Sequence, residues 1–203
     1  MKIRGKTLSS ENSGSQWNAP GMRPTLNGTG FMFEVLDEFA NGFIEYSRTI
    51  EAPVLDIGCA FGVASRPALE GGARVVACDM EQRHLDILRA EINPEHLDRL
   101  ECVQGSLPSV DFEPGRFGAI LCSRVLHFLD GSAIDASIRK MASWLQPGGR
   151  LYLLADTPYG FWRRFIPVFE AKTARGDRWP GLLLSPENYL PFKQKGQSMN
   201  MPP

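Results

Sequence analysis

The sequence predicts an α/β fold in which a doubly wound, mostly parallel sheet of about five strands carries helices on both faces. Short apolar runs alternate with amphipathic stretches between residues 52 and 157. Runs that are apolar at nearly every position are typical of parallel strands buried on both faces. The first run, within APVLDIGCAFG from Ala52 to Gly62, leads directly into a turn of small residues. Together these features favour one open sheet with a ligand site at its edge.

The amphipathic stretches and apolar runs predict nine elements. The first helix depends on the helical spacing of Phe31, Val35, Leu36 and Phe39. The later helices are expected to end at Gly71–Gly72, Asn93–Pro94 and Pro147–Gly149. In chain order we expect helix 31–46, strand 53–57, helix 63–69, strand 74–78, helix 82–92, strand 100–104, strand 117–122, helix 133–145 and strand 150–155.

Outside this pattern the composition changes at both ends of the chain. Residues 1–30 are rich in Ser, Asn, Gly and Thr and show no period, so we expect a flexible N-terminal arm with Trp17 as an anchor. Residues 31–157 then form the domain. Residues 158–203 contain several prolines and one strand-like run, 182–184, so we expect a C-terminal lid or extension.

Length and charge restrict the class of protein. A chain of 203 residues suffices for one α/β domain with extensions. Lys and Arg number 22 against 23 Asp and Glu, for a net charge of −1. There is no global basic field, so we expect no nucleic-acid partner. The polar N-terminus lacks a signal-peptide core and no apolar run approaches membrane-spanning length, so we expect a cytoplasmic protein without a membrane span.

The cysteines favour a reduced protein without a metal site. All four lie in or beside predicted strands, and none belongs to a CxxC pair. We therefore expect them to be core residues rather than metal ligands. They are Cys59, Cys78, Cys102 and Cys122.

The turn after the first strand predicts an anion or nucleotide site. Gly58, Ala60 and Gly62 occupy alternate positions, and small residues there let the backbone approach a ligand beside unpaired helix N–H groups. The alternative is a tight turn with no ligand. Ligands of open α/β sheets bind beyond the carboxyl ends of the strands. We therefore expect several segments to converge there: Asp56 to Gly62, Asp79, Ser106, residues 122–127 and Asp156.

The spacing of the small residues discriminates between nucleotide ligands. Dinucleotide enzymes need a third glycine where this chain has Val63, which disfavours a nicotinamide dehydrogenase. An acid, Asp56, stands two residues before Gly58. The pattern resembles the D/E-x-G-x-G-x-G signature of class I S-adenosylmethionine-dependent methyltransferases, with Ala60 in the middle glycine position. That resemblance implies a Rossmann-like fold and S-adenosylmethionine as the cofactor.

The resemblance extends from Ala52 to Asp156 and implies roles for individual residues. Asp79 matches the acid that binds both ribose hydroxyls, and Met80 matches the residue that packs on adenine. The acid that often contacts the adenine amino group is absent, because Ser106 follows Gly105 there. The PGG turn before the last strand also matches. The implied cofactor-binding residues are Asp56, Gly58, Cys59, Ala60, Gly62, Asp79, Met80, Ser106, Leu107 and Ser123.

Methyl transfer needs alignment of the acceptor and exclusion of water, and it needs a general base only for a poorly ionised or ammonium acceptor. His127 is the candidate base, with a capping or core histidine as the alternative. Asp156 and Tyr159 are candidate substrate residues, with a loop acid and a packing aromatic as the alternatives. We expect His84 and His96 to be solvated on helix surfaces.

These observations favour methyl transfer to a small-molecule acceptor. The segment VLHFL resembles small-molecule methyltransferases, and the N/D-P-P-Y/F motif frequent in nucleic-acid enzymes is absent. The alternative is a catalytically inactive methyltransferase-like binding or interaction protein.

The C-terminal part predicts an incomplete sheet. The family's sheet usually ends in an antiparallel hairpin, but residues 158–203 offer no pair of alternating runs. A bare apolar edge at strand 150–155 invites association. We expect residues 159–190 to cover it, or a second copy to do so in a homodimer. A third alternative is a chain truncated at its C-terminus, with an open acceptor pocket.

Overall fold

The computed structural model describes residues 21–160, 162–183, 185, 188 and 189. The expectations for residues 1–20, including the anchor Trp17, lie outside the described residues. So does the polar end of the chain from residue 190 onward.

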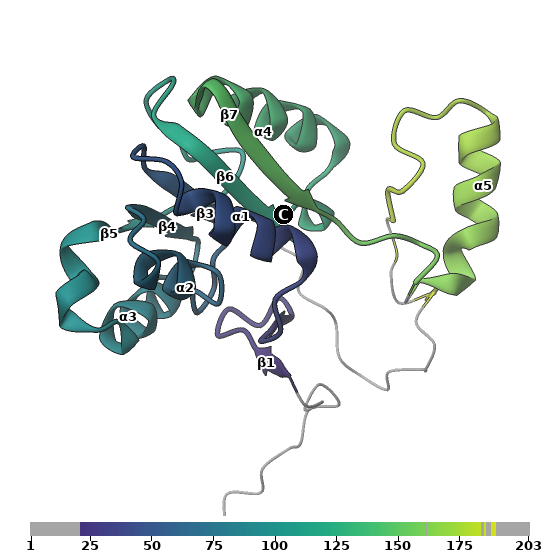
Figure 1. The fold of residues 1–203 in the computed structure, drawn as a ribbon. Helices are drawn as coiled ribbons and strands as arrows, with labels where there is room; N and C mark the ends of the chain where they lie inside the picture. The colour runs from purple at the N-terminus through teal and green to yellow at the C-terminus, as the bar shows by residue number, and fades with distance from the viewer. Residues whose placement is uncertain (1–20, 161, 184, 186–187, 190–203) are drawn as a thin grey trace, which may run out of the picture.

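The central sheet has five parallel strands in the order β5-β4-β3-β6-β7 (Figure 1). The predicted doubly wound sheet is therefore confirmed. Reversal of the strand order beside β3 places a topological switch point next to the turn of small residues. The strands are β3 (Val54–Ile57), β4 (Val75–Asp79), β5 (Leu100–Gln104), β6 (Phe117–Ser123) and β7 (Leu145–Leu154).

Two apolar clusters cover the two faces of the sheet. Alternate residues of a strand point to opposite faces. Val54 accordingly packs in a cluster with α1, α2 and α3, whereas Leu55 packs in a cluster with α4 and the segment around Phe112. The helices are α1 (Glu38–Ser47), α2 (Ser65–Glu70), α3 (Gln82–Glu91), α4 (Gly131–Trp144) and α5 (Ile166–Ala174), with 3₁₀ turns η1 (Pro94–Arg99), η2 (Leu126–Phe128) and η3 (Arg163–Phe165).

The expected helix at 31–46 is wrong in its first half. Residues 31–33 instead form strand β2 (Phe31–Phe33), which pairs antiparallel with β1 (Met22–Pro24). The helix begins only after Asp37, whose carboxylate accepts hydrogen bonds from the amides of Phe39 and Ala40. A capping acid at that position fixes the helix start. Residues 21–30, which the composition assigned to the arm, belong to the β1–β2 hairpin.

The last strand begins earlier than expected, directly after α4. Its pairing with β6 jumps from Phe117–Leu145 to Ala119–Arg150, so residues 146–149 loop out of the ladder. Gly148 in that loop has φ +80°. The PGG turn therefore interrupts β7 rather than ending the helix. From Arg150 onward β7 continues as an edge strand.

After Leu154 the described residues contain no further strand. The expected cover of the β7 edge by residues 159–190 is not what their contacts show. Arg178 pairs with Asp135 of α4 at 2.6 Å, and the Trp179 ring packs on Gly131 at the start of α4. Among the described helices, none has the length and apolar content that a membrane crossing requires.

Candidate functional site

The turn after β3 is fixed to the end of β4. The amides of Gly58 and Cys59 both donate to the carbonyl oxygen of Cys78, at 2.8 and 3.1 Å. The amide of Gly105, after β5, donates to the carbonyl of Asp79 at 2.9 Å. These bonds bring the carboxyl ends of the three strands into one rigid edge.

Both glycines of the turn are required by the protein's own packing. Gly58 and Gly62 each have φ +75°, where an L-residue is strained. A Cβ on Gly58 would lie 2.3 Å from Cγ2 of Val125, and one on Gly62 would lie 2.3 Å from Cδ1 of Leu88. A side chain at Gly58 would therefore clash with Val125 of the protein itself.

Asp79 holds the middle of the turn. Its Oδ2 accepts from the amide of Ala60 at 2.8 Å, and its Oδ1 accepts from the amide of Glu81 at 2.9 Å. Ala60 has φ +45°, an unusual value for alanine, and the bond to Asp79 stabilises it. With Nδ1 of His84 also at 3.0 Å from Oδ1, three of about four acceptor positions on this carboxylate are used.

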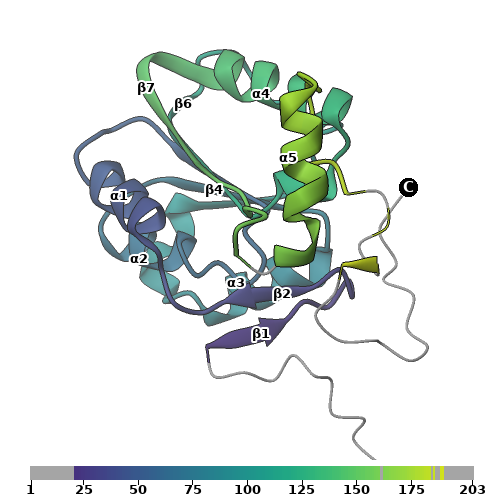
Figure 2. The ribbon, with the colours of Figure 1, turned by 90° about the vertical axis from the view of Figure 1, so that its right-hand side faces the viewer.

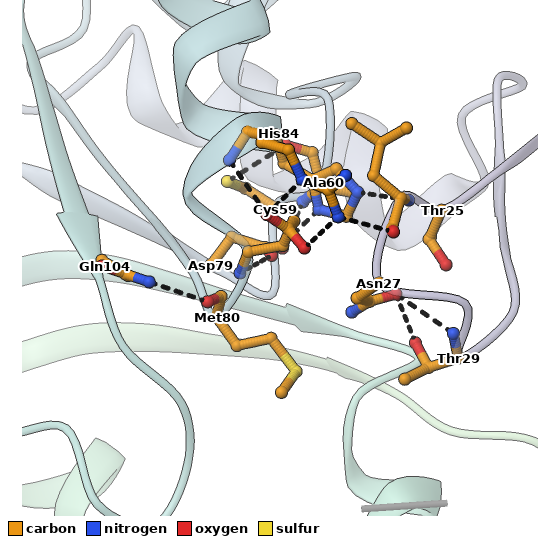
Figure 3. Close-up of polar contacts among 12 residues, drawn as sticks. Thr25, Asn27, Thr29, Cys59, Ala60, Asp79, Met80, His84 and Gln104 are labelled. Carbon is orange, nitrogen blue, oxygen red and sulfur yellow. Dashed lines mark hydrogen bonds and ion pairs between the residues drawn. The ribbon is translucent and has the colours of Figure 1, made fainter. Parts of the chain in front are cut away.

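His84 is buried rather than solvated, so that expectation is wrong. Its side chain is 1% exposed. Nδ1 faces Asp79, and Nε2 accepts a hydrogen bond from the amide of Leu26 at 2.9 Å. Since Nε2 accepts, the proton lies on Nδ1, which donates to Asp79. Figure 3 shows His84 between Asp79 and the turn that holds Thr25 and Asn27.

Asp56 is a second buried acid beneath the turn. Its Oδ2 accepts from the hydroxyl of Ser65 at 2.6 Å. Burial, partly opposed by that bond and reinforced by the charge of Asp79, raises the pKa of Asp56 to about 6. A carboxyl group shifted in this way lacks a cationic partner, and a cation beside it would favour its ionised form.

The other predicted cofactor residues differ in accessibility. Met80 is 45% exposed directly after Asp79, while Leu107 and Cys59 are buried in the core. The Cys59 thiol has a pKa raised well above its usual value by burial, so it is an inert core group. Ser106 and Ser123 are half-buried at the ends of β5 and β6. All four cysteines are free thiols.

On the other side of the switch point the structure brings His127 and Asp156 together. Nδ1 of His127 lies 4.0 Å from Oδ2 of Asp156, with side-chain exposures of 31% and 45%. Burial lowers the pKa of His127; Asp156 opposes that effect and Arg124 adds to it. Tyr159 does not join this pair through its hydroxyl, which contacts Glu170 of α5 at 3.3 Å.

The sequence hypotheses missed the β1–β2 hairpin as part of this region. The guanidinium of Arg23 in β1 stacks over the Phe61 ring at 3.6 Å, and that of Arg124 stacks over the Phe33 ring of β2 at 4.5 Å. Arg124 also pairs with Asp37 at 3.1 Å. The hairpin is thereby attached at the ends of both β3 and β6. Figure 2 shows the β1–β2 hairpin next to α3.

The strand order and the turn of small residues define a Rossmann-like fold, and comparisons with known proteins identify the kind of domain. Residues 54–149 match the family model described as a methyltransferase domain. The matched range begins at β3 and ends within β7, so it contains the turn, Asp79 and His127.

Two curated relatives show similar matches. The chain is 37% identical over 113 residues to a cypemycin N-terminal methyltransferase from a Streptomyces species, covering 54% of this chain and 44% of that protein. It is 34% identical over 148 residues to a ubiquinone biosynthesis O-methyltransferase from Xanthomonas euvesicatoria pv. vesicatoria (strain 85-10), covering 71% and 58%. The chain thus spans about half the length of the curated relatives it matches.

Among solved structures, the glycopeptide N-methyltransferase MtfA complexed with sinefungin aligns with a TM-score of 0.50 and 24% identity, covering 56% of this chain and 47% of that one. This likeness supports the fold. Together with the family match, it confirms the resemblance drawn from the sequence. Residues 54–149 therefore form a methyltransferase domain, and its fold is that of the class I S-adenosylmethionine-dependent methyltransferases.

The residues present fit that family's cofactor. S-adenosylmethionine carries a sulfonium and an ammonium group, and Asp56 is a buried acid that has no cationic partner among the described residues. Asp79 keeps one acceptor position for a ribose hydroxyl. The bidentate clamp on both hydroxyls expected from the sequence would require one of its present donors to move.

Proposed function

We propose that this chain is an S-adenosylmethionine-dependent methyltransferase whose acceptor is a small molecule or a peptide. The match of residues 54–149 to a methyltransferase domain carries the proposal, because this range contains the turn of small residues and both buried acids. The relatives' names add two kinds of acceptor, a peptide N-terminus and an oxygen acceptor.

The proposed roles divide between the two halves of the carboxyl edge. S-adenosylmethionine supplies an activated methyl group on its sulfonium. Asp56 and the turn from Gly58 to Gly62 would hold the methionine part, and Asp79 and Met80 the adenosine part. Ser106 stands where the family often has an acid that contacts the adenine amino group. Here its hydroxyl or its backbone would make that contact.

His127 would act as the general base for the acceptor. Its lowered pKa keeps the imidazole neutral near pH 7, as a proton acceptor must be. Asp156 would orient it through the Nδ1 side, which leaves Nε2 for the acceptor proton. With its proton taken by His127, the acceptor would be ready to receive the methyl group that S-adenosylmethionine, held by Asp56, the turn and Asp79, would supply.

The proposal is tested by binding and by turnover. Calorimetric titration with S-adenosylhomocysteine should give saturable binding to one site. Incubation with S-adenosylmethionine and a panel of amine, peptide and hydroxyl acceptors should then release S-adenosylhomocysteine. Binding without transfer to any acceptor would favour the inactive binding protein. Absence of binding would overturn the proposed enzyme and leave only an interaction protein that does not use the cofactor. A homodimer that covers the β7 edge stays a prediction, which sedimentation would test.

A further inference from the structure

The turn of the β1–β2 hairpin satisfies most of its own polar groups. The amide of Thr25 donates to the carbonyl of Gly30 at 3.0 Å, and the amide of Gly28 donates to the carbonyl of Thr25 at 3.3 Å. Oδ1 of Asn27 accepts from both the amide and the hydroxyl of Thr29. The turn therefore has a defined shape before it meets the rest of the domain.

Leu26 is different, because both of its backbone groups bind outside the turn. Its N–H donates to Nε2 of His84 at 2.9 Å, and its carbonyl accepts from Nη2 of Arg83 at 2.8 Å. Two adjacent residues in the first turn of α3 thus hold one peptide segment from both sides. The Phe61 ring, under Arg23, packs edge-on against His84 at 4.6 Å and closes the space beside this contact.

The other nitrogen of His84 reaches Asp79, the acid assigned to the cofactor ribose. A single buried imidazole thus connects the hairpin to a cofactor residue (Figure 3). Two large apolar side chains beside this link, Leu26 at 40% and Met80 at 45%, are left exposed. An apolar ring bound next to Asp79 would cover such surface.

We propose that His84 is a positioning residue of the cofactor site: it joins Leu26 to Asp79 and holds the hairpin against the side where adenosine binds. The inference rests on the proposed function. It assigns the hairpin, residues 21–33, as a wall of that site, and it explains why a histidine is buried with both nitrogens bonded. His84 acts through Asp79 and the hairpin and takes no part in methyl transfer.

Two substitutions separate the two bonds of His84. An asparagine amide occupies the place of Nδ1, so His84→Asn keeps a partner for Asp79 and loses Leu26. A glutamine amide reaches the place of Nε2, so His84→Gln keeps Leu26 and loses Asp79. His96→Asn, in η1, is the matched control. For each chain, hydrogen exchange of residues 21–33 and calorimetry with S-adenosylhomocysteine are measured.

For His84→Asn we expect exchange of the hairpin amides to rise at least tenfold and affinity to fall about tenfold, with β3 and β4 unchanged. For His84→Gln, hairpin exchange should rise less than threefold. A folded Asn variant with hairpin exchange or affinity within twofold of the wild type would overturn the inference. So would a His96→Asn variant with the same losses.

Arg83→Ala provides a second route, since this side chain is 61% exposed and its loss should not prevent folding. We expect faster hairpin exchange and a two- to fivefold loss of affinity, with Arg83→Lys closer to the wild type. If the His84 variants do not fold, unchanged values for Arg83→Ala overturn the inference. A wild-type chain that binds no S-adenosylhomocysteine overturns the proposed function and the inference with it.

Discussion

The two halves of the carboxyl edge are built differently. At the ends of β3 and β4 the acids are buried and bonded to the protein, with Asp79 in contact with Ala60, Glu81 and His84. At the ends of β6 and β7, His127 and Asp156 lie near the surface and 4.0 Å apart. The polar groups of the first half are thus held in place by the protein, whereas those of the second half are more exposed. Under the proposed function the first half would bind the cofactor (the cofactor half), and the second half would bind the acceptor (the acceptor half).

The largest effect should come from the cofactor half. Asp79→Ala removes the acceptor for three hydrogen bonds, each contributing about 1.5–3 kcal/mol when one partner is charged. We expect the free energy of unfolding to fall by about 4.5–9 kcal/mol and affinity for S-adenosylhomocysteine to fall at least tenfold. Asp79→Asn, which keeps one acceptor oxygen, should lose about half as much. Denaturant titration measures the change in stability, and calorimetry measures the change in affinity. An unchanged affinity would show that Asp79 does not bind the cofactor.

The acceptor half should respond in rate rather than in stability. If His127 is the base, His127→Gln should slow methyl transfer by roughly 10²–10⁴. Affinity for S-adenosylhomocysteine should stay within twofold, because the side chain lies outside the cofactor half. Single-turnover kinetics measure this effect. A decrease in the transfer rate smaller than about threefold would show that His127 is not the general base.

Gly58→Ala tests how rigidly the turn is held. The positive φ costs about 1–2 kcal/mol for an alanine, and overpacking against Val125 costs about 1–3 kcal/mol. We expect a total loss of stability of about 2–5 kcal/mol. Val125→Ala in the same chain should recover the part caused by the clash but not the part caused by φ. A double-mutant cycle without recovery would contradict the contact between these residues.

The smallest expected effect is on the pH profile of transfer. Neutral His127 is the active form, so the rate should be constant above its lowered pKa and fall in acid. Asp156 raises the pKa of His127. Asp156→Asn should therefore move the acidic limb to lower pH, whereas Arg124→Gln should move it to higher pH. Rate–pH profiles measure both shifts. Shifts of the opposite sign would show that the fall of the rate in acid does not come from the protonation of His127 beside Asp156.

The sequence predicted that the turn after β3 and Asp79 lie together, but it did not predict the surroundings of His84, and the difference has a physical reason. The turn from Gly58 to Gly62 and the acid at Asp79 are local patterns, and their spacing determines their place on a parallel sheet. The same logic could not identify His84 as buried, because its partner Leu26 is a backbone amide 58 residues away. No side-chain pattern in the sequence marks such a contact.

The hairpin was missed because the apolar residues in 31–39 fit both the spacing of a helix and the alternation of a strand. Phe31, Val35, Leu36 and Phe39 fit a helix, but Phe31 and Phe33 also fit a strand, and their rings pack edge-on at 5.2 Å. Asp37 decides between them by capping the helix that starts at Glu38. The acid was visible in the sequence and was the signal that could have corrected the expected boundary.

The attachment of the hairpin also affects when its contacts can form during synthesis. Phe33 and Asp37 are made early, but their partner Arg124 follows about ninety residues later. At about 5–20 residues per second of synthesis, these early residues wait roughly 5 to 20 s for it. On the ribosome, the hairpin should therefore acquire its full protection only after Arg124 has been synthesised. Pulse-labelled hydrogen exchange would show this, and early protection of residues 21–33 would contradict it.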